Sequence, residues 1–90
     1  MERFDVWTVM YQKLDGKLAI CSFVRMIDAL KKVDELSHAV ISELKNKRKA
    51  SHAVVIGNHK HLIIKGFCDD HEETAIIKVV QSILCVPDAE

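Results

Sequence analysis

The stretch DDHEETAIIKVVQSILCVP, residues 69–87, decides the fold because it supplies the last regular element of the chain. Asp70 precedes Glu73 by three residues, the spacing of a capping box, in which two side chains satisfy free amide groups at a helix N-terminus. Pro87 would end such a helix. Apolar residues recur between them at steps of three and four, at Ile76, Ile77, Val80, Ile83 and Leu84. The stretch therefore predicts an amphipathic helix that closes at Pro87.

A β-hairpin is predicted immediately before this helix, in SHAVVIGNHKHLIIKGF, residues 51–67. Two runs of apolar, largely β-branched residues flank Gly57, Asn58 and His59, which are typical of a turn. With Asn58 and His59 at the centre of the turn, His61 would oppose Ile56. Alternation along the two strands then assigns Ala53, Val55, Leu62 and Ile64 to a helix-facing side, and Val54, Ile56 and Ile63 to an outer side.

The first half of the chain follows the same plan. Asp15-Gly16 indicates a two-residue type I′ turn between two apolar runs, because both residue types tolerate positive φ. This turn predicts a register in which Tyr11 opposes Ile20 and Trp7 opposes Val24. Apolar residues at helical spacing from Met26 to Leu44 then predict an amphipathic helix of about five turns, which should end within KNKRKAS, residues 45–51.

These elements predict a single α+β domain over residues 1–90, with the order ββαββα. Four antiparallel strands would form one sheet, and two helices would pack on one of its faces. The halves 1–47 and 51–86 would then be two degenerate hairpin–helix repeats.

The composition excludes several classes of protein. The chain is 49% hydrophobic and 29% charged, which favours a folded domain over a disordered segment. Its formal net charge is zero, so no overall field would attract nucleic acid or an anionic membrane. Three cysteines without dense spacing, a charged N-terminus and no long apolar run predict a cytoplasmic protein with no membrane contact.

The main functional prediction is an apolar surface on the side of the sheet away from the helices. An antiparallel sheet with helices on one face normally has a polar outer face, and a large exposed apolar area usually marks an interface. We therefore expect a non-enzymatic protein-interaction module, acting as an adaptor, an inhibitor or a subunit, that also forms a homodimer. The expected partner-binding residues are Val6, Met10, Cys21, Phe23, Val54, Ile56 and Ile63.

A basic cluster gives an alternative function. Lys45, Lys47, Arg48 and Lys49 follow one another closely at the expected end of the first helix and could bind the phosphates of RNA or DNA. The same residues would also complement the negative end of the helix dipole without any ligand. Binding of nucleic acid therefore stays the second hypothesis.

A metal site is the third hypothesis. His59, His61, Cys68 and His71 are all possible ligands. About seven residues of strand, roughly 20 Å, separate the first pair from the second, so only a site between two chains could use all four. We expect no metal within one chain, no cofactor and no catalytic residue, since the chain has no phosphate loop, no nucleophile elbow and no Cys-x-x-Cys motif.

Overall fold

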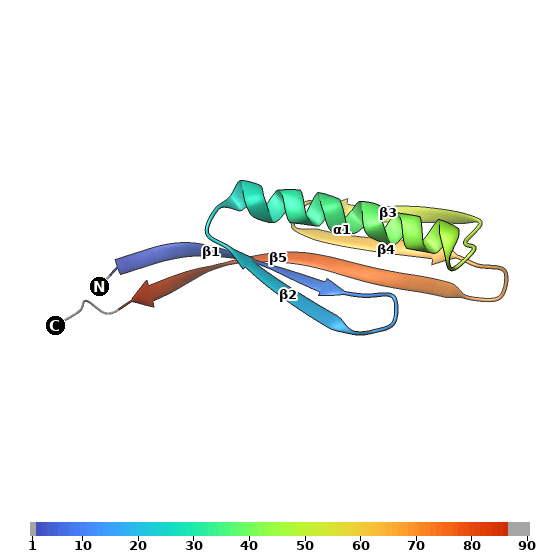
Figure 1. The fold of residues 1–90 in the computed structure, drawn as a ribbon, viewed down its shortest axis with the longest axis horizontal. Coiled ribbons are helices and arrows are strands. Elements are labelled where there is room, and N and C mark those ends of the chain that lie inside the picture. The colour runs from blue at the N-terminus through green and yellow to red at the C-terminus, as the bar shows by residue number, and fades with distance from the viewer. Residues whose placement is uncertain (1, 87–90) are drawn as a thin grey trace.

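The computed structural model describes residues 2–86, and the surroundings of the side chains of residues 5–83. Within this part of the chain, five strands form one antiparallel sheet, and one helix lies across one of its faces (Figure 1). The strands follow the spatial order β2-β1-β5-β4-β3. The elements are β1 (Glu2–Gln12), β2 (Leu18–Phe23), α1 (Met26–Asn46), β3 (His52–Asn58), β4 (His61–Phe67) and β5 (Glu72–Val86).

The α+β class and the antiparallel sheet are confirmed, but the predicted arrangement ββαββα is wrong. Residues 72–86 form the central strand β5 instead of a second helix, so the sheet has five strands and α1 covers it alone. The expected repeat of residues 1–47 in residues 51–86 therefore does not extend to a second helix. Pro87, which was expected to end that helix, lies outside the described residues.

The composition of β5 explains the error. Seven of its fifteen residues are β-branched, and such side chains pack well on a pleated sheet but lose freedom in a helix. Ala75, Ile77 and Val79 are buried at a period of two, as a strand requires. Asp70 does not cap a helix, because Cys68 donates its backbone N–H to the carbonyl of His71 and closes a hairpin loop between β4 and β5.

The loop between β1 and β2 corrects the predicted register by one residue. Lys13 donates its backbone N–H to the carbonyl of Lys17, and Gly16, with a φ of 89°, donates to the carbonyl of Lys13. The loop therefore holds three residues, 14–16, with glycine in the left-handed conformation, and is not a two-residue type I′ turn. Tyr11 consequently opposes Ala19 and not Ile20. A shift of one residue moves every side chain of β2 to the other face of the sheet.

The second hairpin keeps its predicted faces. The turn lies at His59-Lys60, one residue later than expected, and Asn58 Oδ1 accepts the backbone N–H groups of Lys60 and His61 at 2.9 and 3.3 Å. Ile56 opposes Ile63 in the resulting register. The register differs from the predicted one by two residues, so no side chain changes face.

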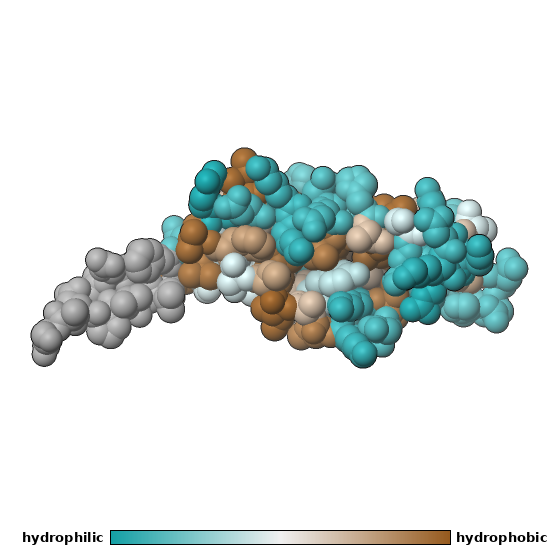
Figure 2. Space-filling model, viewed as in Figure 1, coloured by the Kyte–Doolittle hydropathy of each residue, from teal (hydrophilic) through white to brown (hydrophobic). Residues whose placement is uncertain are grey.

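The core lies between α1 and the sheet. The helix was predicted correctly, and it buries Ala29, Val33, Val40 and Leu44. These side chains meet apolar groups from three strands, at Val9, Ile64, Ala75, Ile77 and Val79. The side of α1 facing away from the sheet is charged, as an amphipathic helix on a single sheet requires (Figure 2).

Strands β1 and β5 extend beyond the rest of the sheet (Figure 1). Their pairing runs from Glu2–Val86 to Gln12–Ile76, whereas β2 pairs only with Trp7–Gln12 and β4 only with Glu72–Lys78. Residues 2–6 and 82–86 thus form a two-stranded ribbon. Within residues 2–86, no helix is long and apolar enough to cross a membrane.

Candidate functional site

The face of the sheet opposite α1, here called the outer face, carries a row of apolar side chains. The strand registers align five residues across all five strands. Four of the five are aliphatic, and the outermost ones are open to solvent: Leu18 is 57% exposed and Ile56 is 47% exposed. The row, from β2 to β3, is Leu18, Gln12, Ile76, Ile63 and Ile56.

More apolar side chains of the outer face flank this row. Ile20 is 58% exposed on β2, Val54 is 39% exposed on β3, and Val80 is 38% exposed on β5. Apolar side chains of the outer face therefore occur from β2 to β3, with Gln12 and Lys78 among them. Figure 2 shows exposed apolar side chains, in brown, near β2 and outside the area that α1 covers. A surface of this kind is typical of a protein interface.

The charged groups of the outer face are mostly basic and lie beside the row. Lys78 lies between Met10 and His61, and Lys65 lies between Val54 and Thr74. At the first residue of β3, the ring of His52 stacks on the ring of Phe67 with a centroid separation of 4.7 Å. An apolar strip with a basic border results.

The structure places five of the seven expected partner-binding residues on this face. Val6, Met10, Val54, Ile56 and Ile63 all lie there by register. Cys21 and Phe23 do not, because Cys21 pairs with the buried Val9 and Phe23 with Trp7 on the helix-facing side. Phe23 packs against the core, whereas Cys21 is exposed.

Sequence reasoning missed four members of the apolar surface. Leu18 and Ile20 were missed because the three-residue loop shifts β2, and Ile76 and Val80 because β5 was expected to be a helix. A signal for β5 was present in its β-branched residues. For the β1–β2 loop, no equally direct signal distinguishes a two-residue turn from a three-residue loop, since Asp-Gly is compatible with both.

The basic cluster lies at the end of α1 and in the loop that follows it. Lys45, Lys47 and Lys49 are exposed. The guanidinium of Arg48, in contrast, donates to Glu73 Oε1 at 2.9 Å and is thereby neutralised. The four residues therefore do not present four unpaired charges.

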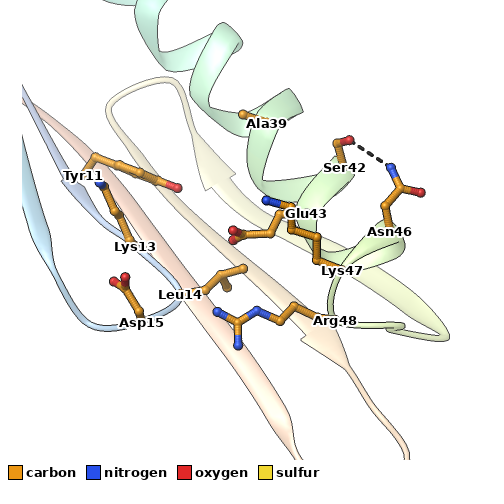
Figure 3. A pocket seen from close by; sticks show the side chains of 10 residues that line it. All are labelled: Tyr11, Lys13, Leu14, Asp15, Ala39, Ser42, Glu43, Asn46, Lys47 and Arg48. Atoms are coloured by element: carbon orange, nitrogen blue, oxygen red, sulfur yellow. Dashed lines mark hydrogen bonds between the residues drawn. The ribbon is translucent and has the colours of Figure 1, made fainter.

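A cleft of about 500 Å³ lies beside this cluster, between the C-terminal half of α1 and the β1–β2 loop (Figure 3). Its lining mixes the cations Lys13, Lys47 and Arg48 with the carboxylates Asp15 and Glu43. It therefore has no clear preference for an ion of either sign.

Tyr11 is the aromatic residue of the cleft. Burial raises the pKa of its hydroxyl, and the charges of Glu43 and Asp15 raise this pKa further. The hydroxyl is therefore neutral at physiological pH and does not provide a general base.

The four possible metal ligands fall into two groups, as the length of β4 requires. His59 and His61 lie at the β3–β4 turn, whereas Cys68 and His71 lie in the β4–β5 loop at the other end of the strand. At this second end, Glu73 joins Cys68 and His71, so that one potential ligand atom of each lies within 4.8 Å of the others. The sequence analysis did not include Glu73 among the possible ligands because it was assigned to a helix cap.

Comparisons of the chain with known protein families, with curated proteins and with solved structures gave no match.

Proposed function

We propose that this chain is a non-enzymatic protein-interaction module that forms a homodimer by packing its outer face on that of a second copy. The observation that carries the proposal is the apolar row from Leu18 to Ile56, which crosses all five strands on the side without a helix. A second copy offers the same apolar row, and a two-fold axis allows the two rows to face each other.

The size of the outer face suits a weak dimer. Five strands spaced by about 4.8 Å, with roughly seven residues each, make a face of about 500 Å². Burying it on both copies gives about 1,000 Å², which is near the lower limit of a specific interface. We therefore expect the dimer to dissociate at roughly micromolar concentration.

The basic border predicts how salt affects this dimer. Lys65 lies beside the row on β4, and Lys78 lies on the central strand β5 between Ile76 and Val80, so two copies that pack face to face bring their ammonium groups close together. Like charges at the interface repel each other, and salt screens that repulsion. Dimerisation should therefore strengthen as the ionic strength rises.

Sedimentation equilibrium of purified protein over a range of concentrations tests the proposal. Wild type should show a monomer–dimer equilibrium, and Ile56→Glu should shift it to monomer because it places a charge within an apolar interface. Ile27→Glu is the matched control, since Ile27 is 50% exposed on α1 and Ile56 is 47% exposed on the outer face. A wild-type monomer at all concentrations, or equal effects of the two variants, would contradict the proposal.

Nucleic-acid binding by the basic cluster is supported less well by the geometry. Arg48 is paired with Glu73, and the aromatic residues Trp7 and Tyr11 pack against the core instead of offering stacking surfaces. Salt separates the two hypotheses, because binding of phosphates weakens with salt whereas the proposed dimer strengthens.

A further inference from the structure

Three side chains with different metal-binding atoms meet where the β4–β5 loop joins β5. They are the thiol of Cys68, the imidazole of His71 and the carboxylate of Glu73, and one potential ligand atom of each lies within 4.8 Å of the others. The hydrogen bond from Cys68 N to His71 O, at 2.9 Å, closes the loop and holds the first two residues together. Glu73 follows as the second residue of β5. The arrangement thus depends on a rigid hairpin and not on a flexible segment.

The carboxylate of Glu73 has one oxygen without a partner. Its side chain is only 13% exposed, and Oε1 accepts the hydrogen bond from Arg48. Oε2 is buried and has no hydrogen-bond partner among the described residues. A buried acceptor in this state costs free energy. A cation bound to Oε2 would remove that cost, while Arg48 stays on Oε1.

The imidazole of His71 is held by a neighbouring carboxylate. Its Nδ1 hydrogen-bonds to Asp70 Oδ1, which leaves Nε2 available. A carboxylate on the second ring nitrogen is common for histidines that bind metals, because it fixes the ring and makes the ligating nitrogen more basic. Asp70 therefore supports the cluster without being a ligand.

The thiol of Cys68 lies among acidic side chains. Burial raises its pKa, and so do the charges of Glu73, Asp70 and Asp69, while Arg48 opposes them. Its Sγ contacts the backbone carbonyl of Arg48 at 3.4 Å. The same acidic neighbours that disfavour a thiolate favour a divalent cation.

We propose that Cys68, His71 and Glu73 form a zinc-binding site within one chain, with water as the fourth ligand. One sulfur, one nitrogen and one oxygen are a donor set that suits Zn²⁺ and not Mg²⁺ or Ca²⁺, which prefer oxygen alone. Tetrahedral bonds of about 2.0–2.3 Å place ligand atoms roughly 3.3–3.7 Å apart. The three ligand atoms, which lie within 4.8 Å of one another, would draw closer by up to roughly 1 Å when the ion binds.

Titration of the reduced, metal-free chain with Co²⁺ tests the proposal, because a thiolate–Co²⁺ bond gives a charge-transfer absorption band. The band should saturate at one ion per chain, and Zn²⁺ should displace it. Cys68→Ser should abolish the band, whereas Cys21→Ser, which changes an exposed cysteine outside the cluster, should keep it. His71→Ala should weaken binding and His59→Ala should not. Asp70→Asn should weaken it about 10- to 100-fold.

Alkylation of the wild-type chain gives a second readout that requires no variant to fold. Zn²⁺ should protect Cys68 from iodoacetamide but not Cys21, as mapped by mass spectrometry of the peptides. Absence of a Co²⁺ band in wild type, a band that survives Cys68→Ser, or equal alkylation of Cys68 with and without Zn²⁺ would each overturn the proposal.

Discussion

Gly66 illustrates how single residues position α1 on the sheet. It is buried on β4, and a Cβ built at this position would collide with both methyl groups of Leu44, which is itself fully buried. The helix can approach the sheet here only because the residue below it has no side chain.

Gly66→Ala should therefore destabilise the fold by overpacking, by about 1–3 kcal/mol. The free energy of unfolding in urea measures this effect. A double-mutant cycle isolates its cause: in a Leu44→Ala background, the same change should cost much less because the collision is removed. Equal costs in both backgrounds would show that the contact with Leu44 is not responsible.

The pair formed by Asp70 and His71 should make stability depend on pH. Its hydrogen bond and charge interaction lower the pKa of Asp70, and the hydrogen bond to Asp70 raises the pKa of His71. The contribution of His71 is present below its unfolded pKa, about 6.5, and is lost as pH rises through the higher folded pKa. The contribution of Asp70 is present above its unfolded pKa, about 3.9, and is lost as pH falls through the lower folded pKa.

The pair should therefore stabilise the metal-free chain most between about pH 4 and 6.5. Urea unfolding of wild type and Asp70→Asn from below pH 4 to above pH 6.5 measures it, and the difference in the free energy of unfolding should be largest between these limits and shrink beyond both of them. A difference that stays constant with pH would contradict the proposed pairing.

The β1–β2 hairpin shows, at the scale of an element, how one loop residue decides which side chains form a surface. With the observed register, Phe23 packs against the core and Ile20 lies on the outer face. A two-residue turn would have exchanged these roles.

Introducing a glutamate at Phe23 or at Ile20 tests this register. Phe23→Glu should lower the free energy of unfolding by about 2 kcal/mol because it brings a carboxylate into the core. Ile20→Glu should change it by less than about 0.5 kcal/mol when the protein is dilute enough to be monomeric. Thermal or urea denaturation followed by circular dichroism compares them, and the reverse order of effects would refute the register.

The pairing of β5 predicts which of its backbone amides exchange fast with solvent. Val79 donates its backbone N–H to the carbonyl of Lys60, the residue just before β4. Because backbone N–H groups alternate in direction along a strand, those of Gln81 and Ile83 point to the same side of β5, where β4 no longer pairs with it. Those of Val80 and Ser82 point to β1. Amide hydrogen exchange should be fast at Gln81 and Ile83 and slow at Val80 and Ser82. Slow exchange at all four positions would mean that another chain covers this edge.

For the molecule as a whole, the sequence predicted those features that depend on alternation or on a long helical period. Helix α1 and the faces of β3 and β4 follow directly from Val33, Val40, Ile56 and Ile63. The apolar residues of β5 fit the spacing of a helix and that of a strand equally well. Its position between β1 and β4 depends on contacts with residues that are distant in the sequence. The meeting of Glu73 with Cys68 and His71 could not be predicted before β5 was known to be a strand.

Most of the candidate interface was nevertheless predictable. Val6, Met10 and Val54 lie on the outer face whichever element residues 72–86 form, because the alternation of side chains along their own strands places them there. Because residues 72–86 form a strand and not a helix, Ile76 and Val80 add to the apolar surface of the outer face. No second helix packs on the sheet within the described residues.

Intermolecular NOEs between the methyl groups of two copies test the dimer most directly. A sample mixed from isotopically labelled and unlabelled chains should show contacts of Ile56, Ile63 and Ile76 in one copy with apolar side chains of the outer face in the other. Ile27 on α1 should show none. Intermolecular contacts confined to α1, or none at concentrations well above micromolar, would contradict an interface on the outer face.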